Sequence, residues 1–133
     1  MIELHDDHVF YAFSRDLEPV LDVDSGTTVR IRTKDCFGNQ VQTPEDELDS
    51  IDWDAINPAT GPVFVNGAKP GGALKVAIEN IEFDGQVACC TGKDEGVCGD
   101  MFEAWSTRLC KIEDGHVVWS DGLRLPTNPM IGV

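Results

Sequence analysis

Glycine and proline recur so often along this chain that long helices have little room between them. The 133 residues include 13 glycines and 7 prolines, on average about one in every seven residues. Glycine weakens a helix interior and proline breaks it, whereas both suit turns between short strands. The sequence therefore predicts a mainly β chain. Its length and its 41% of hydrophobic residues fit one domain over residues 1–133.

Two stretches alternate between apolar and polar residues, as half-buried strands do. Residues 27–33 (TTVRIRT) put Val29 and Ile31 on one face and arginines on the other. Residues 73–83 (ALKVAIENIEF) repeat the pattern over a greater length, with apolar side chains on one face at Leu74, Val76 and Ile78. A period of two predicts a strand at each place, with the apolar face turned inward.

Hairpins are the predicted building blocks of the fold. Residues 108–119 (RLCKIEDGHVVW) hold two apolar stretches around Asp114-Gly115, and Asp-Gly is a strong hairpin signal. Residues 19–33 and 62–78 share one plan: Pro-Val, a short strand, a glycine turn and an alternating strand. This repeat suggests a duplicated hairpin. The predicted fold is a β-sandwich or distorted barrel built from hairpins.

The longest interruption of the strand pattern is an acidic stretch, residues 43–61. Six acidic residues lie between Glu45 and Asp54. Thr43-Pro44 could open one short helix there, because threonine caps helices and proline fits the first turn. The acidic spacing does not match a calcium-binding EF-hand loop. We expect a solvated acidic loop.

Charge and hydropathy argue against several functions. The formal net charge of −14, from 24 acidic and 10 basic residues, disfavours binding to nucleic acid or to an anionic membrane surface. No apolar run approaches the roughly 20 residues of a membrane span, and the first ten residues, MIELHDDHVF, lack the features of a secretory signal. We therefore expect the five cysteines to be reduced thiols in the cytoplasm.

A candidate site lies where the first alternating stretch ends, in residues 31–40 (IRTKDCFGNQ). Asp35 and Cys36 stand side by side, followed by Gly38, which allows a tight turn. Asp35 could bind a metal through its oxygens, or it could cap the turn by accepting backbone hydrogen bonds. Cys36 as a nucleophile needs a nearby base, and cysteines are more often small buried apolar residues. These residues by themselves favour capping and packing.

The remaining reactive residue types show no site spacing. No C-x-x-C pair that would indicate a zinc cluster occurs among the other cysteines, which are Cys89, Cys90, Cys98 and Cys110. No motif includes any of the three histidines, His5, His8 and His116, and the last is expected to be exposed beside its hairpin turn. Residues 89–100 (CCTGKDEGVCGD) lack the phosphate-loop pattern and predict a flexible loop, a type of segment that often lines pockets.

Three separated blocks carry a more specific signal. Residues 57–82 (NPATGPVFVNGAKPGGALKVAIENIE) resemble the acetamidase/formamidase segment Asn-Pro-x-x-Gly-Pro-Val-x-Val-x-Gly-Ala-x-Pro-Gly-Asp-x-Leu, although Gly72 stands where that family usually has Asp. Residues 33–41 (TKDCFGNQV) resemble the family's Thr-x-Asp-Cys-Phe-x-x-Gln stretch. Residues 124–133 (RLPTNPMIGV) resemble the segment that leads into the family's central region. The blocks follow the family's order through nearly the whole chain.

The resemblance implies a function and a site. It implies an amidohydrolase that converts short linear amides, such as formamide or acetamide, into a carboxylate and ammonia. It also implies a largely β fold with sandwich and barrel elements, a homodimer or higher oligomer, and a divalent metal, zinc first of all. Asp35 corresponds to one of the family's acidic site residues. The resemblance therefore favours a catalytic or metal-binding role for Asp35 over the capping role.

The resemblance covers only the first half of the family's pattern. The family continues with a glycine-rich segment containing a histidine and then a Gly-Gly-Asn-Met-Asp motif, which supplies further site residues and does not occur here. We therefore expect one subunit of a split enzyme, a fragment, or a shortened homologue. A non-catalytic β scaffold or assembly module derived from the family is the alternative.

Two expectations about the isolated chain follow. It should hydrolyse neither formamide nor acetamide, because one carboxylate cannot hold a catalytic zinc, which takes three protein ligands. The other ligands would come from a second chain or from the missing half. The chain should also not be a monomer, because a sheet that is cut short exposes unpaired strands, which associate with a partner chain or with another copy.

Overall fold

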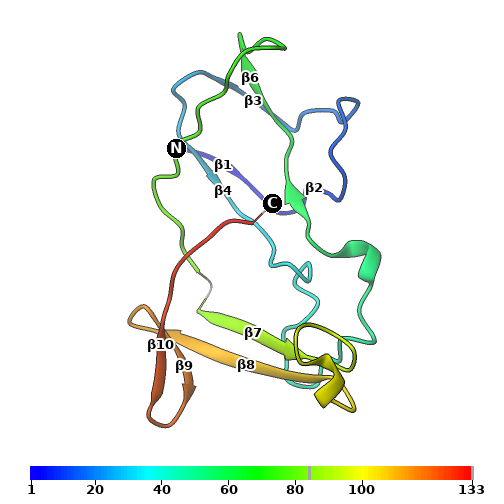
Figure 1. Cartoon of the computed structure of the whole chain (residues 1–133). Coiled ribbons are helices and arrows are strands. Elements are labelled where there is room, and N and C mark those ends of the chain that lie inside the picture. The colour runs from blue at the N-terminus through cyan, green and yellow to red at the C-terminus, as the bar shows by residue number, and fades with distance from the viewer. Residues whose placement is uncertain (84, 133) are drawn as a thin grey trace. The chain divides into compact units, whose positions relative to one another are not determined.

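The computed structural model describes residues 1–83 and 85–132, and within them the chain divides into two compact units (Figure 1). The first unit comprises Met1–Asn39 and Asp52–Ile78, and the second comprises Gln40–Ile51 and Glu79–Gly132. One domain over residues 1–133 stays a prediction. Val133, the last residue of the third resemblance block, lies outside the described residues.

The first unit is built from strands that pair two by two. Two pairs are parallel and one is antiparallel. The parallel pairs are β1 (Ile2–Leu4) with β4 (Val29–Ile31) and β3 (Leu21–Asp24) with β6 (Val63–Asn66), and the antiparallel pair is β2 (Val9–Phe10) with β5 (Ala59–Thr60). A short 3-10 helix, η1, spans Trp53–Ala55.

The two repeated Pro-Val segments pair with each other rather than forming two hairpins. β3 and β6 run parallel, with Leu21 opposite Val63 and Asp24 opposite Asn66. The Asn66 side-chain amide donates a hydrogen bond of 2.9 Å to the Asp24 carboxylate. β4, which follows β3 after a glycine turn, pairs with β1 instead. The predicted duplicated hairpin is therefore wrong, because each strand takes its hydrogen-bonding partner from a distant part of the chain.

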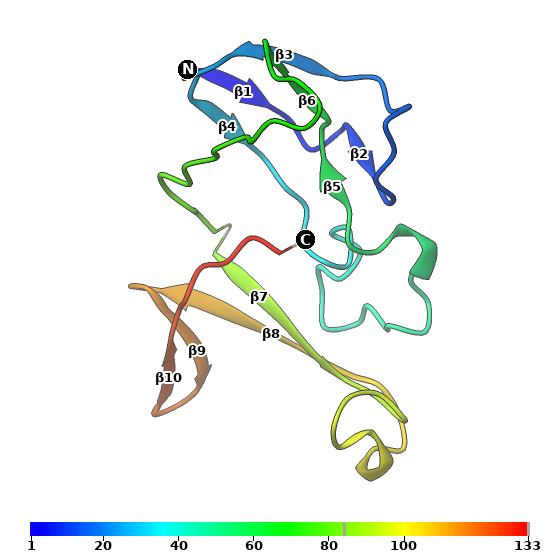
Figure 2. The same ribbon diagram turned by 45° about the horizontal axis from the view of Figure 1, so that its top comes forward.

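The longer alternating stretch, residues 73–83, forms no strand in the structure (Figure 2). Its three apolar side chains are exposed instead of turned inward: Leu74 is 62% exposed, Val76 is 74% and Ile78 is 69%. The prediction of a half-buried strand is therefore wrong for this chain by itself. Alternation favours an extended backbone, but a strand also needs a neighbour to hydrogen-bond with, and the described residues provide none here.

The second unit is an antiparallel sheet of four strands in the order β10-β9-β8-β7. Its strands are β7 (Gln86–Thr91), β8 (Ser106–Glu113), β9 (His116–Ser120) and β10 (Leu123–Pro126), and the 3-10 helix η2 (Gly99–Met101) lies between β7 and β8. The hairpin predicted over residues 108–119 is confirmed. Asp114 and Gly115 both have positive φ angles, 49° and 70°, as a two-residue turn of type I′ requires.

The acidic stretch is partly anchored instead of being a solvated loop throughout. Leu48 is only 1% exposed, and so is Val41, just before the stretch. The Thr107 hydroxyl of β8 donates a hydrogen bond of 3.2 Å to the Asp46 carbonyl. The short helix also begins later than Thr43, since Asp52 caps η1 by accepting a hydrogen bond of 3.0 Å from the Asp54 amide.

The buried apolar core is small in the part of the chain that the structure describes. Its side chains are Leu4 and Val23 in the first unit and Val41, Leu48 and Cys110 in the second. No α-helix occurs in residues 1–83 and 85–132, so the predicted mainly β fold is confirmed. None of the described segments is a helix long and apolar enough to cross a membrane.

Candidate functional site

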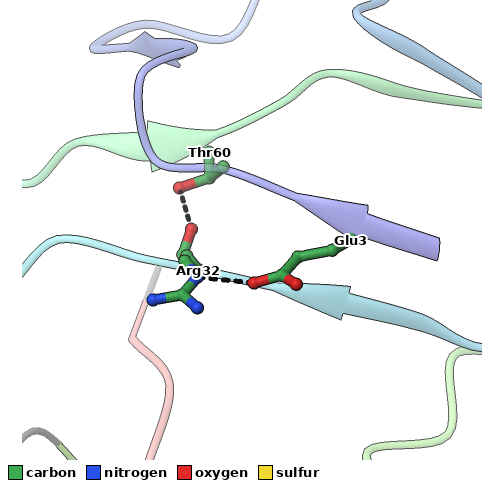
Figure 3. Close-up of polar contacts among 3 residues, drawn as sticks. All are labelled: Glu3, Arg32 and Thr60. Carbon is green, nitrogen blue, oxygen red and sulfur yellow. Dashed lines mark hydrogen bonds and ion pairs between the residues drawn. The ribbon is translucent and has the colours of Figure 1, made fainter. Parts of the chain in front are cut away.

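The candidate site follows β4, and hydrogen bonds of Arg32 fix the backbone that leads into it (Figure 3). The Arg32 amide donates a hydrogen bond of 2.9 Å to the Leu4 carbonyl, and its guanidinium donates one to the Glu3 carboxylate. The Thr60 hydroxyl of β5 donates a hydrogen bond of 3.0 Å to the Arg32 carbonyl. The bond from Arg32 lowers the pKa of the Glu3 carboxyl. Three strands thus hold the entry to the Asp35 turn.

Asp35 organises the turn that follows. Its Oδ1 accepts hydrogen bonds from the backbone amides of Phe37 (3.0 Å) and Asn39 (2.7 Å). The Asn39 side-chain oxygen returns a contact by accepting a hydrogen bond of 3.0 Å from the Asp35 amide. Gly38 and Asn39 both have positive φ angles, 66° and 62°, a conformation that glycine and asparagine tolerate best. The capping role considered for Asp35 is therefore real in the structure.

Capping does not use the whole carboxylate. Both backbone bonds reach Oδ1, and no hydrogen bond from another described residue reaches Oδ2 of Asp35. The side chain is exposed. The turn therefore orients the carboxylate and leaves one oxygen able to accept a proton or to contact a cation. A site role for Asp35 stays a prediction.

Cys36 departs from its predicted packing role, because it is exposed and takes part in no disulfide. Its backbone carbonyl accepts a hydrogen bond of 2.7 Å from the Asn57 amide. Asn57, like Asn39, has a positive φ angle. Neither asparagine was singled out for this turn from the sequence, although the Gly38-Asn39 pair is a recognisable turn signal.

The described residues do not make a metal site by themselves. No group of three or more His, Cys, Asp or Glu side chains that could hold an ion is found among them. His116 is half-buried rather than exposed, with its Nδ1 2.8 Å from the Asp114 carbonyl oxygen. Burial and the neighbouring thiols of Cys110 and Cys90 raise the pKa of the Cys89 thiol. A raised pKa disfavours the thiolate that binds metals.

The loop of residues 92–105 lines an open hollow in the second unit. The hollow has a volume of about 400 Å³, and Cys90, Glu95, Cys98, Phe102 and Trp105 are among its lining residues. The Trp105 ring packs so closely on Gly92 that a Cβ at Gly92 would lie 2.2 Å from it. The loop predicted over residues 89–100 therefore begins later than expected, because residues 89–91 belong to β7, but its remainder does line a hollow.

The fold and the Asp35 turn can now be compared with known proteins. Residues 2–116 match the model of the Acetamidase/Formamidase family, and the chain belongs to that family. The family resemblance inferred from the three sequence blocks is therefore confirmed. None of the curated proteins matches the chain.

Two solved structures are similar over almost the whole chain. An acetamidase from Bacillus halodurans shares 39% identity with a TM-score of 0.94, and it is covered over 45% of its length by 99% of this chain. A predicted acetamidase/formamidase from Thermoanaerobacter tengcongensis shares 45% identity with a TM-score of 0.93, with 44% of its length covered by 99% of this chain.

A third structure supports the fold alone. An acetamidase from Yersinia enterocolitica shares 21% identity with a TM-score of 0.67, and 94% of this chain covers 43% of it. The chain thus spans less than half the length of each of these three proteins. The activity of a whole acetamidase can therefore only be proposed for it.

Proposed function

We propose that this chain contributes one part of a metal-dependent amidohydrolase that cleaves short linear amides, such as formamide or acetamide, into a carboxylate and ammonia. The divalent metal is proposed to be zinc. The assembled enzyme is proposed to be an oligomer, formed from copies of this chain or with a second chain that supplies the remaining portion of the fold. It would act in the cytoplasm, where reduced cysteines persist, with no nucleic acid or membrane as partner.

The observation that carries this proposal is the match to the Bacillus halodurans acetamidase, 39% identical with a TM-score of 0.94 over 99% of this chain. Identity at that level along an almost unbroken backbone match supports a shared reaction, although fold alone does not imply function. The block 33–41 adds local support, since it carries Asp35 in the family's Asp-Cys-Phe context.

Asp35 is the residue proposed to act in the reaction. Its Oδ1 is held by two backbone amides, at 3.0 and 2.7 Å, so the carboxylate has a defined position before any substrate binds. Positioning of this kind is what a general base or a metal ligand requires. The described residues alone do not gather a ligand set, so the other site groups are proposed to come from the portion of the fold that this chain does not span.

A scaffold is the second candidate function. It is favoured by the absence of a ligand cluster among the described residues and by the exposed apolar side chains between residues 73 and 78. In this case the chain would bind the rest of an acetamidase-like assembly without contributing to the chemistry. Asp35 would then be a turn cap only.

The two functions are separated by an ammonia-release assay with formamide and acetamide. The probe partner is the portion of the Bacillus halodurans acetamidase that this chain does not cover, co-expressed with the full 133-residue chain in zinc-containing medium. We expect ammonia from the complex and none from the chain alone. Turnover by the pure isolated chain would contradict the proposed division of the site between two portions.

Asp35→Asn tests the proposed residue without breaking its turn, because an asparagine side-chain oxygen can still accept both backbone hydrogen bonds. We expect activity of the complex to fall at least about 100-fold, the usual contribution of a general base. Asp46→Asn is the matched control, since Asp46 accepts hydrogen bonds from the amides of Gln42 and Thr43, both at 2.8 Å, and has no proposed site role. Equal activities of the two variants would favour the scaffold.

A further inference from the structure

Residues 73–81 follow a turn in which the Gly72 amide donates to the Lys69 carbonyl, and they have no backbone hydrogen-bond partner among the described residues. Leu74, Val76 and Ile78, here called the apolar stripe, are 62–74% exposed. No backbone hydrogen bond to any other described residue is recorded for residues 73–81. An edge with these properties is a template for another β-strand, because it offers both unpaired amides and apolar side chains.

The chain exposes more surface than a compact protein of its mass would expose. The structure exposes 10324 Å², whereas a compact monomer of 14.5 kDa would expose about 6,900 Å². Even two separate compact bodies of half that mass would expose only about 8,300 Å². Separating the two units can only add to the 10324 Å², so the units taken apart exceed this second value by at least about 2,000 Å².

That excess identifies the kind of partner. A standard protein–protein contact covers about 800 Å² on each side, which is well below the excess on this chain. Obligate interfaces are larger and resemble a domain core cut in half. The acetamidases from Bacillus halodurans and Thermoanaerobacter tengcongensis keep the same backbone over 99% of this chain while containing more than twice its length. The protein that would cover this excess surface is therefore a folded portion about as large as this chain.

We propose that the apolar stripe is a docking surface for a β-strand from the remaining portion of the acetamidase fold. This inference rests on the proposed function and locates the binding site of the second portion. A strand with alternating apolar residues would pair with the backbone of residues 73–81, and the apolar side chains on one of its faces would pack beside Leu74, Val76 and Ile78. The pairing would be the same whether that portion lies on the same polypeptide or on another.

Hydrogen exchange on the complex tests this pairing directly. The full chain is co-expressed with the uncovered portion of the Bacillus halodurans acetamidase, and peptides from residues 73–81 are followed by mass spectrometry. In the complex we expect their amides to exchange at least about tenfold more slowly than in the chain alone, because strand pairing protects them. The β7–β8 ladder, already paired in the chain, is the internal control and should change less.

A pair of variants tests the stripe itself. Val76→Asp places a charge on the stripe, whereas Ala77→Asp makes the same change of charge on the next residue, which belongs to the opposite face. We expect the dissociation constant of the complex to rise at least about tenfold for Val76→Asp, since burying an unpaired charge is costly, and to change little for Ala77→Asp. Equal weakening by both variants would overturn the proposal.

The remaining outcomes also decide the question. If residues 73–81 become protected in the chain alone as its concentration rises, the occupant is a second copy and the proposal is overturned. A complex without protection would also overturn it. So would the failure of two soluble polypeptides to form a complex. If the added portion is insoluble, the same exchange measurement is made on a single polypeptide that joins the two portions. Protection without ammonia release would uphold the docking surface and reject the proposed function; ammonia release without protection would do the reverse.

Discussion

The two units of this chain pair their strands in different ways. In the second unit, β7 to β10 follow one another in sequence and in space, so each strand after β7 finds its neighbour through a turn or loop. In the first unit, β1 pairs with β4 and β3 with β6, across tens of residues, and both pairs are parallel. Parallel strands need long connections, whereas antiparallel neighbours need only a short turn.

This difference indicates which unit needs contact with other protein to satisfy its open strand edges. A sheet of four neighbouring strands satisfies most of its inner backbone groups by itself. Pairs of two strands leave two open edges each, and isolated two-stranded ribbons are marginally stable in water. The first unit also holds the apolar stripe, which is exposed. We therefore expect substitutions in the anchored parts of the second unit to cost most, and substitutions in the stripe to cost least, as long as the chain is alone.

The largest effect is expected from Leu48→Ala. Leu48 is 1% exposed and belongs to the second unit, so the substitution should lower the free energy of unfolding by about 2–5 kcal/mol, the range for truncating a buried leucine. Leu74→Ala removes the same atoms from an exposed position and should change it by less than about 0.5 kcal/mol. Urea denaturation measures both. Equal losses would show that Leu74 is packed within the isolated chain and would contradict the expected difference between the second unit and the stripe.

A smaller loss is expected from Gly92→Ala. The added Cβ would lie 2.2 Å from the Trp105 ring, so the ring or the backbone must shift, at a cost of about 1–3 kcal/mol in unfolding free energy. Gly132→Ala is the control, because the nearest atom to its Cβ would be the Met130 sulfur at 3.9 Å. Tryptophan fluorescence during urea denaturation reports both stability and the Trp105 environment. An unchanged Gly92→Ala variant would mean that the Trp105 ring is not held against Gly92.

Each unit also carries one acid-sensitive contact. The Arg32 hydrogen bond lowers the pKa of Glu3 in the first unit, and the Gln42 and Thr43 amides lower the pKa of Asp46 in the second. A lowered folded-state pKa stabilises the fold above the ordinary values, 4.5 for Glu3 and 3.8 for Asp46, and this stabilisation is lost as the pH falls below them.

The pH dependence of the urea midpoint, measured from about pH 6 to about pH 3, tests this pair of contacts. We expect Glu3→Gln and Asp46→Asn each to flatten the acid-induced decrease relative to the unaltered chain. If neither variant changes the slope, other carboxyl groups govern acid unfolding. A change confined to Asp46→Asn would mean that only the second unit contributes to the measured transition.

The smallest effect is expected in the stripe. In the isolated chain, Val76→Asp and Ala77→Asp should each change the unfolding free energy by less than about 0.5 kcal/mol, because both side chains are exposed. Thermal melts of the two variants check this. A marked loss for Val76→Asp alone would place Val76 in the core of the isolated chain and would remove the basis of the docking surface.

The candidate site was predictable as a segment but not as a geometry. Asp35, Gly38 and Asn39 indicate a turn from residue type alone, and the structure has it. The bonds that Asp35 accepts depend on the φ angles of Gly38 and Asn39, and the Cys36 carbonyl accepts a hydrogen bond from the distant Asn57 amide. The bond between Cys36 and Asn57 joins residues 21 positions apart, and no local pattern specifies it.

Turn residues, alternation and motif blocks are local properties, so the mainly β class, the Asp114-Gly115 hairpin and the family could be predicted from them. Three features follow only from the folded structure: β3 pairs with β6, Leu48 is buried within an acidic stretch, and Leu74, Val76 and Ile78 remain exposed. The physical reason is that alternation prepares an extended backbone with one apolar face, whereas burial requires a second surface, and whether that surface exists depends on the rest of the fold.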